Sequence, residues 1–234
     1  FSDENYVKAY KAAASEVRRK YHEVMLISDT EHGFPRKIAS AMHRPEIAKL
    51  VDAYVVHTIG WDSESVADVH QKIRDNLPPR PWFQNEYEYL KGGTSPERCL
   101  NTVQHIMNSF QIAENPTWFW IHALKPYPNE EARGYALGLW RSMVDSETIK
   151  FKPDDPLADR LKSLKPGHWI YNDYNWNAVG SFVKQMPWDC VALGVIEYEY
   201  NGDARIFAYL KPNGKRVMVV SNRTGKPYSF KIET

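Results

Sequence analysis

The chain has 234 residues, 43% of them hydrophobic and 25% charged, which is typical of one folded domain or slightly more. Its 30 Lys and Arg residues nearly balance 29 Asp and Glu residues, and no dense basic cluster occurs, so we expect no nucleic-acid partner. No apolar run approaches the roughly 20 residues that a membrane-spanning helix needs, so we expect no membrane partner.

The first part of the chain alternates between helical and strand patterns. Apolar residues at helical spacing predict helices over residues 6–20, 45–51, 63–76 and 95–111. Short apolar runs predict strands over residues 23–29, 53–57, 81–88 and 117–122. This alternation is typical of parallel β/α architecture, and four such units make half of an eight-stranded barrel.

The period is lost between Lys125 and Asp173, where five prolines mark a long excursion of the kind that is usually functional. A helix over residues 174–185 follows. Beyond Pro187, four runs separated by turn residues predict antiparallel strands over residues 191–200, 204–210, 216–220 and 228–232. We expect these strands to pack against the barrel portion, because they cannot bury both faces alone.

Two domains are therefore predicted: residues 1–187 form part of a (β/α)8 barrel, and residues 188–234 form part of a β-sandwich. Neither looks complete, so we expect the chain to be the C-terminal portion of a longer protein. Cys99 and Cys190 have no metal-type spacing; two inert thiols are favoured over one long-range bridge. The first residues lack a signal-peptide pattern, so the location is not predicted from this end.

Polar and aromatic side chains gather at the predicted carboxyl ends of the four strands. They are Asp29, Glu31 and His32; His57; Asn85, Glu86 and Glu88; and Trp120 and His122. A single strand-end acid is more often a helix cap, and a single His is more often a satisfied core group. Together they are too polar and too aromatic for an inactive rim, and parallel barrels place their chemistry at this end.

The segment 82–89 is the most informative. Strict alternation would place three acceptor side chains on one strand face and three aromatic rings on the other. The first set is Gln84, Glu86 and Glu88, and the second is Phe83, Tyr87 and Tyr89. Two carboxylates buried on one face repel each other and raise at least one pKa, unless a cation, hydrogen bonds or a substrate compensates. Folding stability alone does not explain two carboxylates on one strand face.

This order of motifs resembles the C-terminal half of a retaining glycoside hydrolase of clan A, and is similar to families 30, 39 and 86, agarase/porphyranase-like or xylanase-like. In such enzymes the seventh strand carries Trp, a few residues, then Glu-Tyr, which Trp82 and Glu86-Tyr87 match. The resemblance implies an α/β fold: strands five to eight of a (β/α)8 TIM barrel, followed by an antiparallel β-sandwich module.

The resemblance also implies a function, cleavage of β-glycosidic bonds in a polysaccharide by retaining double displacement. Glu86 is then the nucleophile, and Glu88 lies one layer nearer solvent. The acid/base Glu is expected upstream of this chain, at the end of strand four, because Glu88 projects in the same direction as Glu86. The expected substrate-binding residues are His32, His57, Glu88, Trp120 and His122.

In this interpretation His57 holds Glu86 or donates to a sugar hydroxyl. The Trp120 ring, with Trp118 or Trp61 as further candidates, stacks on a pyranose ring inside a cleft. The expected partners are a polysaccharide or oligosaccharide and the N-terminal half of the same barrel. A polysaccharide substrate favours a secreted or periplasmic location.

Two alternatives remain. A non-catalytic carbohydrate-binding barrel would keep the aromatic cleft and lose one carboxylate. A phosphate-binding or metal-dependent barrel enzyme is less favoured, because the last strand ends lack a Gly-rich turn and because His57 and His122 have no close ligand neighbour. No metal site and no cofactor are predicted.

Overall fold

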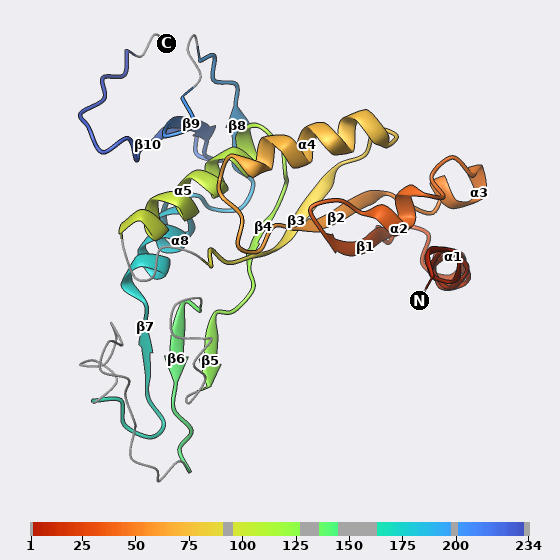
Figure 1. The fold of residues 1–234 in the computed structure, drawn as a ribbon, viewed down its shortest axis with the longest axis horizontal. Coiled ribbons are helices and arrows are strands. Elements are labelled where there is room, and N and C mark those ends of the chain that lie inside the picture. The colour runs from red at the N-terminus through yellow and green to blue at the C-terminus, as the bar shows by residue number, and fades with distance from the viewer. Residues whose placement is uncertain (1, 91–95, 127–135, 145–162, 198–200, 232–234) are drawn as a thin grey trace.

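The computed structural model describes residues 2–90, 96–126, 136–144, 163–197 and 201–231 (Figure 1). Its centre is a parallel sheet whose strands follow the order of the chain, β1-β2-β3-β4. The strands are β1 (Ile27–His32), β2 (Ala53–His57), β3 (Trp82–Tyr87) and β4 (Trp118–Trp120). The predicted α/β class with a parallel sheet is confirmed.

Helices connect these strands and cover one face of the sheet (Figure 1). They are α1 (Asp3–Lys20), α2 (Arg36–Ala39), α3 (Pro45–Ala48), α4 (Ser65–Asn76) and α5 (Pro96–Gln111). The main core joins Tyr54 and Val56 of β2 to Val66 and Val69 of α4. No helix in the described parts of the chain is long and apolar enough to cross a membrane.

The first strand starts later than predicted, at Ile27 rather than residue 23. Val24 and Met25 are exposed, and the Arg18 guanidinium of α1 donates to the carbonyl oxygen of Val24. Apolar residues in this segment therefore lie in a loop held by α1. A sequence pattern of apolar residues does not distinguish such a loop from a buried strand.

Strand β3 contains an irregularity that changes which side chains share a face. Val56 pairs with Gln84, but the next residue, His57, pairs with Glu86, so β3 carries an extra residue at this point. Gln84 therefore lies on the helix-covered face together with Val56. Gln84 lies opposite Phe83 as predicted, but the prediction that Gln84 shares a face with Glu86 is wrong, because a bulge interrupts the period of two.

The excursion after β4 holds a second, smaller sheet that the sequence pattern did not predict. Its strands are β5 (Leu124–Pro126), β6 (Gly138–Trp140) and β7 (Trp169–Tyr171). β6 runs parallel to β5 and antiparallel to β7. The chain then enters α8 (Asp173–Gln185), whose Asn172 cap accepts from the backbone N–H groups of Tyr174 and Asn175.

The terminal sheet consists of β8 (Val191–Leu193), β9 (Ala204–Leu210) and β10 (Arg216–Asn222), in the order β10-β9-β8. Phe207 and Tyr209 of β9 pack on Ile106 and Met107 of α5. These strands therefore pack, as expected, against the part of the chain that holds the parallel sheet. Residues 194–197 and 228–231 form no strand, and the remaining ends of the two predicted strands, residues 198–200 and 232, lie outside the described residues. Both cysteines are free thiols.

A polar clamp joins this terminal sheet to the part of the chain that holds the parallel sheet. The Arg223 side chain, at the end of β10 and 13% exposed, donates to the carboxylates of Asp62 at 2.9 Å and Asp203 at 2.7 Å. It also donates to Asn101 Oδ1 of α5 at 2.9 Å. Burial raises the pKa of Asp62, but Arg223 outweighs it and holds the pKa below its usual value.

Arg223→Ala is expected to lower the free energy of unfolding by about 1–3 kcal/mol, because Asp62, Asp203 and Asn101 lose the donor that they share. The lower end reflects the partial exposure of both carboxylates. Urea unfolding of the variant and of Arg216→Ala, which changes an exposed arginine at the start of β10, measures the effect. Equal losses in the two variants would contradict a specific clamp.

Candidate active site

Glu86 lies at the carboxyl end of β3 and faces the end of β2. Its Oε2 is 3.9 Å from Nδ1 of His57, and the side chain is 36% exposed. The two residues are register partners, so they project from the same face of the sheet. The His57 Nδ1 atom is buried and has no hydrogen-bond partner among the described residues. The carboxylate is thus accessible, and a nearby imidazole nitrogen is unsatisfied.

His32 and Trp61 extend this pair into a row. His32 is the register partner of His57, their ring centroids are 5.1 Å apart, and the Trp61 ring meets His32 edge-on at 4.6 Å. Burial, reinforced by His57, lowers the pKa of His32. Gly33 has φ +76°, and a Cβ there would stand 2.3 Å from the Trp61 ring. Only glycine therefore lets Trp61 pack against this turn.

Glu88 is in a different environment from Glu86. It is 3% exposed, and its Oε1 lies 2.6 Å from Nδ1 of His122. Burial raises the pKa of Glu88, and the hydrogen bond with His122 partly offsets this. The expectation that Glu88 lies nearer solvent than Glu86 is wrong. Glu88 is the covered acid of the two, and its hydrogen bond ties β3 to the segment after β4.

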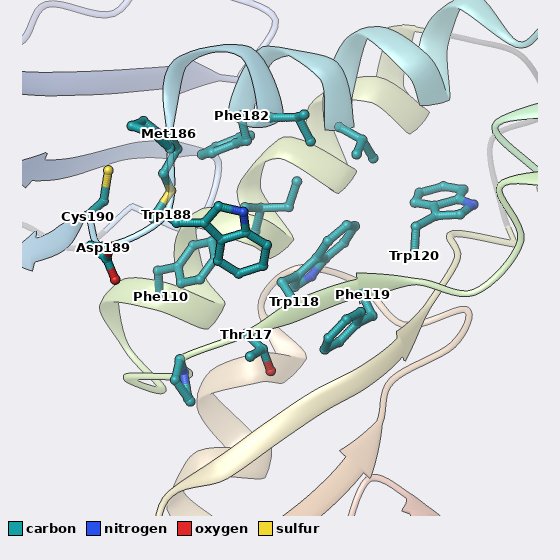
Figure 2. A pocket seen from close by; sticks show the side chains of 15 residues that line it. Phe110, Thr117, Trp118, Phe119, Trp120, Phe182, Met186, Trp188, Asp189 and Cys190 are labelled. Carbon is teal, nitrogen blue, oxygen red and sulfur yellow. The ribbon is translucent and has the colours of Figure 1, made fainter. Parts of the chain in front are cut away.

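Trp120 lies on the opposite side of the sheet from Glu86. Figure 2 shows Trp118 and Trp120 pointing from β4 toward the helices, with Phe119 on the other side. The Trp118 indole N–H donates to Nδ1 of His105 on α5, which fixes that side as the helix face. Trp120 does line a cavity, of about 460 Å³, but this cavity lies between β4, α5 and α8.

The aromatic residue of β4 on the face of Glu86 is therefore Phe119, which is 53% exposed. Phe119 was not among the predicted site residues, because the end of this strand was assigned to Trp118 and Trp120. The alternation of residues 118–120 was the signal that would have found it.

The acids of β1 do not join the row. Glu31 is the register partner of Val56 on the helix face, and its Oε2 accepts from the backbone N–H of Lys37. Both carboxylate oxygens of Asp29 are buried, and this burial together with Glu31 raises the pKa of Asp29 to about 7. In the described residues, no three His, Cys, Asp or Glu side chains are grouped so as to hold a metal ion.

Comparison with known proteins finds similarity in structure. No protein-family model matches the chain, and no curated protein matches it. A GH30 endoxylanase from Clostridium papyrosolvens C71 matches 94% of this chain and 45% of its own, with 12% identity and a TM-score of 0.54. SrfJ from Salmonella typhimurium matches 95% of this chain and 46% of its own, with 14% identity and a TM-score of 0.63.

The endo-beta1,6-glucanase BT3312 matches 94% of this chain and 47% of its own, with 12% identity and a TM-score of 0.58. The chain thus spans less than half the length of each of these structures. The similarity lies in the fold and extends over almost all of this chain.

Proposed function

We propose that this chain, which has the fold of the clan A glycoside hydrolases, supplies strands five to eight of the barrel of a retaining β-glycosidase and part of its β-sandwich. The observation that carries the proposal is the state of Glu86. Among the strand-end acids, Asp29 has buried carboxylate oxygens, Glu31 accepts from the backbone N–H of Lys37, and Glu88 is paired with His122. Of these acids, only Glu86 has a partly exposed carboxylate on the face of the sheet opposite the helices.

A carboxylate in this position can act as a nucleophile. Glu86 attacks the anomeric carbon, the glycosidic C–O bond breaks, and a second carboxyl group gives its proton to the leaving oxygen. The same second group then takes a proton from the water that hydrolyses the glycosyl-enzyme ester. Retention requires the two carboxyl groups to be roughly 5 to 5.5 Å apart. We place the second group at the end of strand four of the barrel, because Glu88 forms a hydrogen bond with His122.

The neighbouring residues suit binding and orientation. His57 is close enough that a small rotation gives a hydrogen bond to Glu86 or to a sugar hydroxyl lying between them. The His32 ring packs against His57, and Trp61 packs against His32. Phe119 offers an apolar ring on the face of the sheet that carries Glu86. The proposed substrate is a β-linked polysaccharide or oligosaccharide, and the proposed partner is a polypeptide segment that completes the barrel.

Covalent labelling tests this proposal. The full-length protein is treated with a fluorosugar inactivator, digested and analysed by peptide mass spectrometry, and the anomer formed first is determined by NMR. We expect the adduct on Glu86 and a product of retained configuration. An adduct on Glu88 or an inverted first product would refute the assignment. Glycan binding without any turnover would instead favour the non-catalytic carbohydrate-binding barrel.

A further inference from the structure

The small sheet β5-β6-β7 has two unlike faces. Leu139 of β6 is buried, as are Ala136 and Leu164 in the adjoining segments, so one face is packed. Trp140 pairs directly with Trp169, which places both on the other face. Tyr171 lies two residues beyond Trp169 and shares that face. The unpacked side of this sheet is therefore aromatic.

Trp176, from the first turns of α8, completes the group. Its ring centroid lies 6.2 Å from that of Trp169 and 5.5 Å from that of Tyr171, and the two β7 rings are 5.9 Å apart. Exposed fractions are 51% for Trp169, 42% for Trp176, 39% for Trp140 and 37% for Tyr171. We call these four residues the aromatic platform. Grouped rings left open to water are not explained by folding and mark a binding surface.

The backbone beneath the platform packs closely at Gly138. Gly138 is the register partner of both Tyr171 and Leu124, and the Leu124 Cδ2 atom lies 2.8 Å from the position that a Cβ would take. A Cβ at Gly138 would meet the carbonyl oxygen of Ile170 at 2.4 Å. Only glycine therefore keeps β6 and β7 paired at this position.

Backbone hydrogen bonds join the small sheet that carries the platform to the segment after β4. The backbone N–H of Leu137 donates to the carbonyl oxygen of His122 at 2.9 Å, and that of Gly138 donates to Ala123 at 2.9 Å. The His122 side chain in turn holds Glu88. Figure 1 shows the small sheet continuing from the end of β4, where barrel strands place their chemistry. The platform is therefore connected, through the segment after β4 and His122, to the strand end that carries Glu88.

We infer that the aromatic platform binds a glycan chain away from the point of cleavage, so that the substrate is a polymer rather than a short glycoside. This inference rests on the proposed function. The chemistry favours a glycan because a pyranose ring has a flat C–H face that packs on an aromatic ring, while its hydroxyl groups stay in water. The rings of β7 and α8 offer several such contacts side by side.

Native affinity electrophoresis tests the platform with named probes: β-linked glucans, xylan and agar dissolved in the gel. The variants are Trp169→Ala and Trp176→Ala in the full-length protein. Each is expected to weaken binding to the recognised polysaccharide about tenfold, a loss of the size expected for one stacked ring. Trp169→Phe keeps an aromatic ring and is expected to retain most of the binding.

Trp188→Ala is the matched control, since Trp188 is 90% exposed and lines the cavity of Figure 2 instead. Its binding is expected to equal that of the unmodified protein. Unchanged binding in both platform variants, or an equal loss in the control, would overturn the platform. Turnover of a small aryl glycoside by the unmodified protein reports on the proposed function separately. Turnover without polysaccharide binding would refute only the platform. The absence of both turnover and polysaccharide binding would refute the platform and the proposed function.

Discussion

Glu86→Gln is expected to reduce kcat/KM of the full-length protein on a β-glycan by more than about 10⁴-fold, as removal of a nucleophile does in other covalent mechanisms. The amide keeps the shape of the side chain but cannot form the glycosyl ester. Because Glu86 is partly exposed and its nearest ionic contact is His57 at 3.9 Å, the fold loses little by the change. Steady-state kinetics and thermal unfolding of the same preparation measure both effects.

Glu88→Gln is the matched control for that experiment. It makes the same chemical change two residues along the chain, at an acid paired with His122. Measurable turnover is expected to remain, while stability falls because a buried charge-assisted hydrogen bond becomes a neutral one. If Glu86→Gln kept activity within tenfold of the unmodified protein, or if Glu88→Gln were the inactive variant, Glu86 would not be the nucleophile.

Much of the parallel sheet was predictable from the sequence. Helical and apolar runs alternate without long interruptions up to β4, and the carboxyl ends of parallel strands must meet at one edge. For that reason His32, His57 and Glu86 were expected together, and the structure places them in one row. The bulge in β3 was not predicted, because residues 84–86 are all polar and so show no contrast between polar and apolar positions where the face changes.

The small sheet was missed for a different reason. Each of β5, β6 and β7 has three residues, too few to show any alternation, and they lie among prolines. Their pairing depends on contacts that span the excursion, such as those between β6 and β7. The same limit applies to Glu88, whose hydrogen-bond partner His122 lies 34 positions away in the chain.

His105 should make the free energy of unfolding depend on pH. It is fully buried on α5, where its Nδ1 accepts from the Trp118 indole N–H and its Nε2 donates to the Thr58 hydroxyl. Burial lowers the pKa of His105 to about 3. Between that value and the usual histidine pKa, the unfolded chain binds a proton that the folded chain does not, so stability falls as the pH falls.

Asp29 acts in the opposite direction over an overlapping range. Burial raises the pKa of Asp29 to about 7, so between the usual aspartate pKa and that value the folded chain binds the extra proton. Its contribution to stability is present at low pH and is lost as the pH rises through this window. The pH dependence of the unmodified protein therefore mixes both groups, and only a difference between variants isolates His105.

His105→Gln removes the histidine contribution and leaves that of Asp29. Its free energy of unfolding should be lower at pH 7, because hydrogen bonds to Trp118 and Thr58 are disturbed. Between pH 7 and 5, however, the unmodified protein should lose about 2 kcal/mol more than the variant. Urea unfolding at several pH values measures this, with His22→Gln, an exposed histidine, as the control. If the free energy of unfolding changed with pH in the same way in His105→Gln and in the unmodified protein, His105 would bind its proton equally well in the folded and unfolded states. That result would contradict a lowered pKa for the buried ring.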